Sequence, residues 1–225
     1  MSIEVRRALD RFETRSDGIV TRHSFSFGPF YDPGNLGFSA MSAFNDENLQ
    51  AGSGYPDHQH RDTEIVTWVL EGSLVHTDGD GRSVHLGAGD VQRISAGDGI
   101  VHAEIAEPGA STRFLQTWLR PDEPGGAPAY GVEGELGTGP GLTEVIGPHG
   151  LRVRTAGARL LLGHCEPGQI ALPEAARMHV FVVDGRVVVG DRVLDADDAA
   201  RLSDQGGRDL VIEEPAVLAV WAFSV

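Results

Sequence analysis

Apolar and polar residues alternate along most of the chain, and turns containing glycine interrupt the alternation at short intervals. Runs of this kind are typical of β-strands, because successive side chains of a strand point to opposite faces of the sheet. Residues 64–70, 73–77, 91–94 and 100–105 are clear examples, and no convincing long amphipathic helix precedes residue 120. The pattern therefore predicts an all-β fold of short antiparallel strands, as in a sandwich or a barrel.

The strand pattern is interrupted once, near the middle of the chain. Residues 120–141 are rich in proline, glycine and acidic residues, which is typical of a linker or a crossover strap. Strand-like runs resume after this segment. We therefore predict an N-terminal domain over residues 1–120, a connecting segment over 121–141 and a C-terminal domain over 142–225. Within the first domain, the polar and glycine-containing residues 45–56 are expected to form a loop.

The composition excludes some classes of partner. The 18 basic and 33 acidic residues leave a net charge of −15, which should repel phosphate backbones and disfavours direct binding of nucleic acid. Cys165 is the single cysteine, so no intrachain disulfide can form, which fits a reducing compartment. No run approaches the roughly 18 apolar residues of a membrane-spanning helix, and no signal peptide is recognisable. We therefore expect a cytoplasmic protein with no membrane partner.

Two pairs of polar residues bracket the most regular strand region. His58 and His60 precede it, and His102 and Glu104 end it. Residues two apart on a strand point to the same face, so each pair can direct two donor groups at one point. A single His-x-His on a surface strand is more often solvated than metal-binding. Two such pairs around strand-rich sequence favour a metal site in which three imidazoles and one carboxylate converge.

Spacing alone leaves two candidates for the carboxylate. Glu64 has the same strand parity as His58 and His60, so it competes with Glu104. Imidazole and carboxylate ligands suit a first-row divalent ion, and four protein ligands around an octahedral ion leave two positions for substrate, O2 or water. We expect Fe2+ first, with Ni, Cu, Mn or Zn as alternatives.

The blocks around these residues closely resemble the pirin family of the cupin superfamily, in particular its bacterial quercetinase-like members. The matching blocks cover most of residues 20–120 and read TRHSFSFGPFYDPGNLGFS, HQHRDTEIVTWVLEGSLVHTD, GDVQRISAGDGIVHAE and FLQTWL. Departures include Gln59, where the family often has proline, and Ile105-Ala106 after the second pair. They leave all four proposed ligands in place but bear on substrate preference.

The resemblance implies a fold, a ligand set and an activity. The fold is a bicupin of two stacked antiparallel, jelly-roll-type β-barrels, with metal in the N-terminal barrel alone. The ligands are His58, His60, His102 and Glu104, which favours Glu104 over Glu64. The activity is quercetin (flavonol) 2,3-dioxygenation, in which O2 opens the heterocycle and carbon monoxide is released, with Glu104 also acting as the catalytic base.

The remaining expectations concern the surroundings of the metal and the alternative function. Glu64, His76 and Gln116 are expected next to the metal ligands, Glu64 through the resemblance and His76 and Gln116 from their positions on neighbouring strands. The expected partners are a flavonol-like aromatic substrate and O2. In the alternative interpretation, the chain is a non-catalytic, iron-binding redox sensor or co-regulator that acts through a protein partner.

Overall fold

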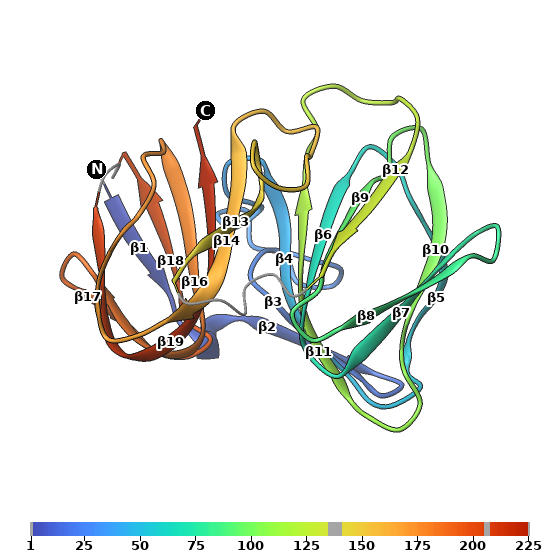
Figure 1. The fold of residues 1–225 in the computed structure, drawn as a ribbon, viewed down its shortest axis with the longest axis horizontal. Helices are drawn as coiled ribbons and strands as arrows, with labels where there is room; N and C mark the ends of the chain where they lie inside the picture. The colour runs from blue at the N-terminus through green and yellow to red at the C-terminus, as the bar shows by residue number, and fades with distance from the viewer. Residues whose placement is uncertain (1, 135–140, 205–207, 225) are drawn as a thin grey trace. The chain divides into compact units, whose positions relative to one another are not determined.

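Strands make up nearly all of the regular structure of this chain. The computed structural model describes residues 2–134, 141–204 and 208–224. All strand pairs in these ranges are antiparallel, as Figure 1 shows, and the helical structure is a 3-10 turn, η1 (Ala8–Asp10). No helix in the described ranges has the length and apolar character needed to cross a membrane. The predicted all-β, antiparallel fold is confirmed.

The chain divides into two compact units, which we describe separately. The N-terminal unit contains Phe12–Glu135 and Val153–Thr155, and the C-terminal unit contains Met1–Arg11, Leu136–Arg152 and Ala156–Val225. These boundaries differ from the predicted ones at the N-terminus. β1 (Ser2–Arg6) pairs with β18 (Ala199–Ser203), so backbone hydrogen bonds join the first residues of the chain to the C-terminal unit.

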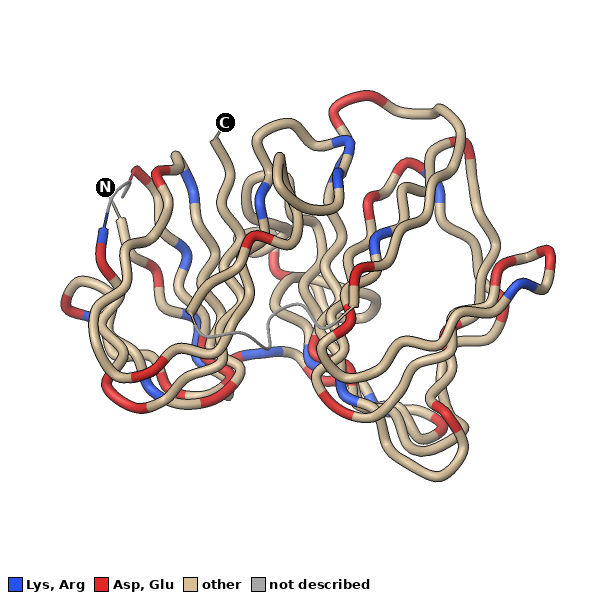
Figure 2. Tube along the Cα trace, in the orientation of Figure 1, with Lys and Arg blue, Asp and Glu red and all other residues tan. Residues whose placement is uncertain are grey.

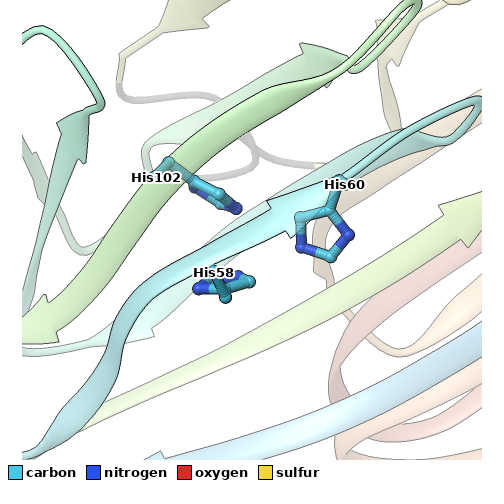
Figure 3. A group of neighbouring side chains, drawn as sticks. All are labelled: His58, His60 and His102. Carbon is cyan, nitrogen blue, oxygen red and sulfur yellow. The ribbon is translucent and has the colours of Figure 1, made fainter.

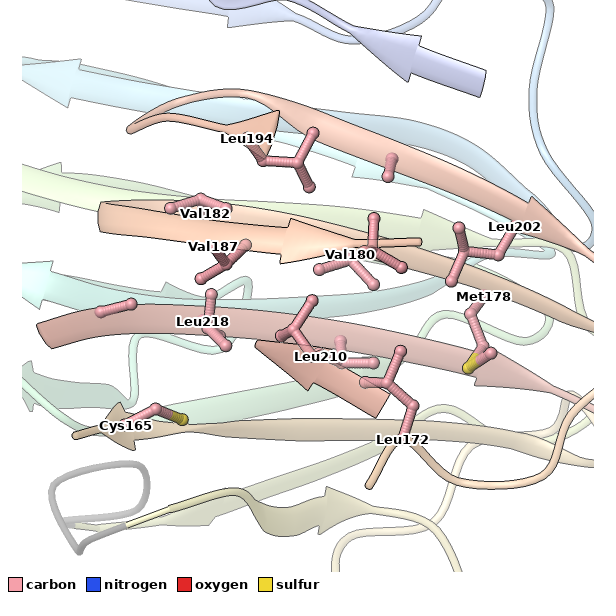
Figure 4. Close-up of a cluster of buried hydrophobic side chains, with 14 of the residues drawn as sticks. Cys165, Leu172, Met178, Val180, Val182, Val187, Leu194, Leu202, Leu210 and Leu218 are labelled. Atoms are coloured by element: carbon pink, nitrogen blue, oxygen red, sulfur yellow. The ribbon is translucent and has the colours of Figure 1, made fainter. Parts of the chain in front are cut away.

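The C-terminal unit contains one sheet of eight strands. Its order is β1, β18, β16 (Arg177–Val189), β19 (Asp209–Phe223), β14 (Ala158–Cys165) and β13 (Thr143–Ile146), with β15 (Gly168–Ala171) on β19 and β17 (Arg192–Leu194) on β16. Alternate residues of these strands form an apolar cluster that includes Met178, Val180, Val182 and Leu218 (Figure 4). Each fully buried aliphatic side chain of this kind contributes about 1.5–3 kcal/mol to folding.

The N-terminal unit contains two sheets that share an apolar core. The larger sheet has the order β12 (Ala129–Glu133), β9 (Val91–Ser95), β6 (Glu64–Glu71), β11 (Thr112–Leu119), β4 (Met41–Leu49), β3 (Ile19–His23) and β2 (Phe12–Ser16). The smaller sheet has the order β5 (Gly54–His60), β10 (Ile100–Ala106), β7 (Ser73–Asp78) and β8 (Ser83–Gly87). Both sheets supply the core, which consists of Leu49, Val69, Leu74, Leu86, Ala106 and Phe114.

Two segments that were expected to be loops contain strands. Residues 45–49 belong to β4, because their polar side chains Asn45 and Glu47 are buried and hydrogen-bonded inside the unit. In the predicted connecting segment, Ala129–Glu133 forms β12, whose backbone pairs with β9. Residues 135–140 of that segment lie outside the described residues. A prediction based on polarity and proline content therefore missed two strands. β4 lines a polar interior, and β12 lies at the edge of the larger sheet.

Charged residues occur along strands and turns of both units (Figure 2). Several arginine–carboxylate pairs are exposed, among them Arg186–Asp195 and Arg15–Glu13. Exposed pairs of this kind contribute little to stability. The pair of Arg113 and Asp46 differs, since Asp46 is fully buried and accepts two hydrogen bonds from the guanidinium at 2.9 and 3.0 Å.

Candidate metal centre

Neighbouring strands of the smaller sheet carry both polar pairs. In the antiparallel pairing of β5 with β10, His58 lies opposite His102 and His60 lies opposite Ile100. The register shifts between His102 and Glu104, because Glu104 lies opposite Tyr55, so β5 has one extra residue there. A bulge of this kind bends a strand and redirects side chains. It allows Tyr55 and His58, three residues apart, to bring their rings into contact, with centroids 6.1 Å apart.

The three histidines converge, as Figure 3 shows. A ring nitrogen of His58, of His60 and of His102 all lie within 4.8 Å of one another. The ring centroids of His58 and His102 are 4.3 Å apart. Glu104 does not join all three at that distance. It forms a second group with His102 and His76, again within 4.8 Å. His102 belongs to both groups and therefore lies at the centre of the arrangement.

Hydrogen bonds leave the Nε2 atoms of two histidines, His58 and His102, without a proton. The Nδ1 atom of His58 donates to the Pro56 carbonyl oxygen at 2.9 Å, so its Nε2 carries a lone pair when the ring is neutral. Asp78 Oδ1 accepts from His76 Nε2 at 2.8 Å. In the neutral form of His76, Nδ1 then accepts from His102 Nδ1 at 3.2 Å, which leaves the lone pair of His102 on Nε2.

The histidine cluster fits a divalent ion. The buried Nε2 of His102 has no hydrogen-bond partner among the described residues. Burial, with the charge of His58, lowers the pKa of His60 to about 4. Burial and the charges of His58, His76 and His60 lower the pKa of His102 to about 3. Both rings are therefore neutral at pH 7, which is the state that binds metal. Neutral imidazole rings offer nitrogen lone pairs, such as that of His102 Nε2, and these are donors that such an ion binds well.

Two glutamine side chains hold the Glu104 carboxylate. Gln92 Nε2 donates to Glu104 Oε1 at 3.0 Å, and Gln116 Nε2 donates to Oε2 at 2.9 Å. Both glutamines and Glu104 are buried. A carboxylate oxygen has two lone pairs, so each oxygen keeps one lone pair for a cation or a proton. The two amides thus orient the carboxylate without occupying all of its acceptor sites.

Aromatic donors orient the two glutamines in turn. Trp118 Nε1 donates to Gln116 Oε1 at 2.9 Å, and the Tyr130 hydroxyl donates to Gln92 Oε1 at 3.0 Å. Because an indole N–H can only donate, it places the amide oxygen of Gln116 toward Trp118 and the amide nitrogen toward Glu104. The Trp118 ring meets His60 edge-on at 5.0 Å, and the Tyr130 ring stacks on His76 at 4.8 Å. Each of the two aromatic donors therefore also contacts a histidine.

The residues expected around the ligands have different positions. Gln116 contacts Glu104, and His76 contacts His102, as described above. Glu64 is buried, but its carboxylate accepts a hydrogen bond from Ser95 Oγ at 2.6 Å, and Glu64 belongs to neither group of potential metal ligands. Ser95 lies opposite Glu64 on β9, so this carboxylate is satisfied within the larger sheet.

Gln116, which the sequence predicted near the ligands, belongs to a row of buried polar residues that was not predicted as a whole. Cross-strand register aligns one residue from each of five neighbouring strands, namely His23, Asn45, Gln116, Thr67 and Gln92. These residues could have been found from the alternation of each strand, because they occupy positions that otherwise hold inward-facing apolar residues. Gln92, for example, lies two residues before the buried Ile94 and therefore faces the same side of the sheet. Such residues in a barrel interior indicate a polar cavity, because buried polar groups must be hydrogen-bonded.

Another buried carboxyl group, Glu47, was not predicted from the sequence. Its Oε2 accepts from Thr21 Oγ1 at 2.5 Å and from the Tyr55 hydroxyl at 2.7 Å. Burial raises the pKa of Glu47 to about 7, although the hydrogen bonds from Thr21 and Tyr55 oppose this shift. The negative charge of Glu104 adds to the increase. Glu47 is therefore a carboxyl group that holds a proton up to near-neutral pH inside the same unit.

Glu47 should make the stability of the metal-free protein depend on pH. Between pH 4.5 and 7 the folded state keeps this proton while the unfolded state loses it, so stability falls as pH rises through that window. A Glu47→Gln variant lacks this loss. We expect the unfolding free energy of the variant, relative to wild type, to rise between pH 4.5 and 8 by roughly 3 kcal/mol at most. Urea unfolding across this range measures it, with Glu123→Gln on the exposed surface as the control. Parallel curves for Glu47→Gln and wild type would contradict the prediction.

The hydrogen bonds from Gln92 and Gln116 to Glu104 should increase the affinity for metal. Replacing Gln92 or Gln116 by leucine removes one donor and leaves a buried carboxylate oxygen unpaired, so Glu104 loses its fixed orientation. We expect either variant to bind divalent metal about 10- to 100-fold more weakly. Competition with a chromophoric chelator measures the affinity, and Gln50→Leu on the exposed surface is the matched control. Equal affinities for all four proteins would mean that the two glutamines do not position Glu104.

Comparison with known proteins agrees with this geometry. Residues 3–119 match the family model described as Pirin. A Mycobacterium tuberculosis protein named "Putative quercetin 2,3-dioxygenase" is 37% identical over 234 residues, which cover 98% of this chain and 94% of that protein. Quercetin 2,3-dioxygenase of Escherichia coli is 40% identical over 130 residues, which cover 57% of this chain and 56% of that protein.

A solved structure shows a likeness in fold over the whole chain. The bacterial pirin YhhW from Escherichia coli, in complex with nickel(II), matches with a TM-score of 0.93 and 28% identity, and the match covers 99% of both chains. This likeness confirms the predicted bicupin fold.

Proposed function

The chain belongs to the pirin family, and from this premise we propose that it is a metal-dependent dioxygenase that opens a flavonol such as quercetin with O2. The observation that carries the proposal is the group of His58, His60 and His102 beside a buried, oriented Glu104. Relatives named quercetin 2,3-dioxygenase support the choice of substrate class.

The proposed metal ligands are His58, His60, His102 and Glu104. Mixed imidazole and carboxylate donors suit Fe2+, and the nickel(II) in the Escherichia coli pirin makes Ni2+ the second choice. When bound, the ion would supply Lewis acidity that favours the ionised form of a substrate hydroxyl. The hydrogen bonds from His58 to Pro56 and from His102 to His76 keep both rings oriented with Nε2 available.

Glu104 is proposed to accept the proton of the substrate hydroxyl. Gln92 and Gln116 each donate one hydrogen bond to a different oxygen of Glu104, so a remaining lone pair is available for the proton. Trp118 and Tyr130 fix the glutamines and thereby the direction of the carboxylate. The burial of Glu104 keeps bulk water away from the proton transfer.

The test is turnover by protein loaded with Fe2+ without oxygen and then given quercetin and O2. We expect loss of quercetin absorbance, uptake of one O2 per quercetin and release of carbon monoxide. His58→Ala should lower these rates to the level of the metal in buffer. His85→Ala is the matched control, because His85 is exposed and pairs with Glu107 outside the histidine cluster. The proposal would be refuted if wild type and His58→Ala both showed only the rate of the metal in buffer.

A further inference from the structure

The N-terminal unit contains a cavity that the metal centre does not use. Its volume is about 440 Å3, which lies within the range of small-molecule sites. It lies where the β7–β8 hairpin, β9, β10 and β12 come together, and none of His58, His60, His102 or Glu104 lines it. The lining residues are His76, Asp78, Gly79, Asp80, Ile94, Ile100, Val101, Pro128, Ala129 and Tyr130.

Most of the cavity wall is apolar. The larger apolar side chains Ile94, Ile100 and Val101 come from β9 and β10, and Val101 is 39% exposed. Ala129 and Tyr130 of β12 add a small side chain and an aromatic ring. Aliphatic and aromatic walls favour a ligand with a broad apolar face, because its burial removes apolar surface from water.

Two of the polar residues that line the cavity, Asp78 and Asp80, are acidic and accept hydrogen bonds. Oδ1 of Asp78 accepts from His76 Nε2 at 2.8 Å, and this bond does not involve the second carboxylate oxygen, Oδ2. Asp80 adds a second carboxylate, and Figure 2 shows acidic positions on the hairpin that joins β7 and β8. Two carboxylates repel an anionic ligand and favour one that donates a hydrogen bond.

Two hydrogen bonds separate this cavity from the proposed metal centre. Asp78 contacts His76, and His76 contacts His102. Tyr130 lines the cavity, stacks on His76 and donates to Gln92, which holds Glu104. A molecule in the cavity would therefore contact residues that orient two proposed ligands, without reaching the ligands themselves.

We propose that this cavity is a binding site for a flat, uncharged aromatic molecule that donates a hydroxyl hydrogen bond to Asp78 and lies beside the metal centre rather than on the metal. The aromatic, hydroxyl-bearing character of the occupant rests in part on the function proposed above. Its position rests on the cavity alone.

The test is a fluorescence titration of the full-length chain without O2, in the nickel-loaded and metal-free forms, with 3-hydroxyflavone and with flavone. Ala129→Phe places a ring in the cavity, and we expect it to weaken 3-hydroxyflavone binding at least tenfold. Ala110→Phe in an exposed loop is the matched control. Asp78→Asn should weaken 3-hydroxyflavone binding about 10- to 100-fold and change flavone binding less, because a charge-assisted hydrogen bond is weakened for the hydroxylated ligand alone.

Two results would overturn the site. One is unchanged affinity in Ala129→Phe, and the other is loss of all binding when the metal is removed, which would place the ligand on the metal. Cavity binding without any oxidation of quercetin would count against the proposed activity and leave this site standing. Oxidation of quercetin at the expected rate, with no ligand binding to the metal-free form, would count against this site and leave the proposed activity standing.

Discussion

His102→Ala is expected to abolish stoichiometric metal binding and to reduce quercetin turnover to the rate of the metal in buffer. His102 belongs to both groups of potential ligands and is fully buried, and its Nε2 has no partner within the part of the chain that the structure describes. Loss of a residue that merely orients a ligand costs 10- to 100-fold in affinity, so loss of this ligand should cost on the order of a thousandfold or more. Elemental analysis after dialysis against a weak chelator measures the binding.

This variant needs a check on folding, because it opens space in a buried site. His58→Ala is the second test, since His58 is less buried and should show the same loss of metal. His164→Ala, an exposed histidine of the C-terminal unit, is the control for the loss of an imidazole. One ion per chain retained by a correctly folded His102→Ala protein would contradict the proposed ligand set.

Glu104→Gln is expected to lower turnover by about 100- to 10,000-fold, the range attributed to a general base. It should also destabilise the protein by about 1–3 kcal/mol, because both neighbouring glutamines donate toward residue 104. The new amide can accept from one of them, but its own nitrogen then faces the other donor. Thermal unfolding measures the second effect, and O2 uptake with quercetin measures the first.

A double variant separates the two effects. Glu104→Gln combined with Gln92→Glu exchanges donor and acceptor across one hydrogen bond and returns the carboxylate to the neighbouring position. We expect this pair of substitutions to recover most of the lost stability and little of the turnover, since the carboxylate no longer lies at position 104. Recovery of turnover in the double variant would show that the position of the carboxylate is unimportant.

Strand periodicity was sufficient to bring the histidines together from sequence. The two-residue period paired His58 with His60 and His102 with Glu104, and the structure brings His102 of the adjacent strand β10 next to His58 and His60, as predicted. Periodicity could not choose between Glu64 and Glu104, because it gives the side of a strand on which a residue lies but not the sheet to which the strand belongs. The structure pairs Glu64 with Ser95 and places Glu104 beside His102.

Other features depend on contacts that local patterns do not contain. Residues 45–49 look like a loop because they are polar, yet Asn45 and Glu47 are hydrogen-bonded inside a barrel whose interior is partly polar. The assignment of the first residues to the C-terminal unit depends on pairing between β1 and β18, nearly 200 positions apart. The bulge between His102 and Glu104 is likewise a property of two strands together.

The role of Gln92 illustrates the same limit at the scale of one side chain. Its sequence neighbours are Val91 and Arg93, which say nothing about a carboxylate on another sheet. Its position opposite Thr67, and three strands away from Asn45, becomes visible only when the registers of β9, β6, β11 and β4 are combined. Long-range register is therefore the information that converted a set of candidate ligands into an oriented site.

The most direct measurement is O2 uptake with quercetin as a function of bound metal per chain. Metal-free protein is loaded in steps with Fe2+ under anaerobic conditions, and His58→Ala is treated in the same way. The proposed metal centre predicts a rate that rises in proportion to bound metal, levels off at one ion per chain and stays at the buffer level in the variant. A rate that does not depend on the bound metal, or that is the same in the variant, would contradict it.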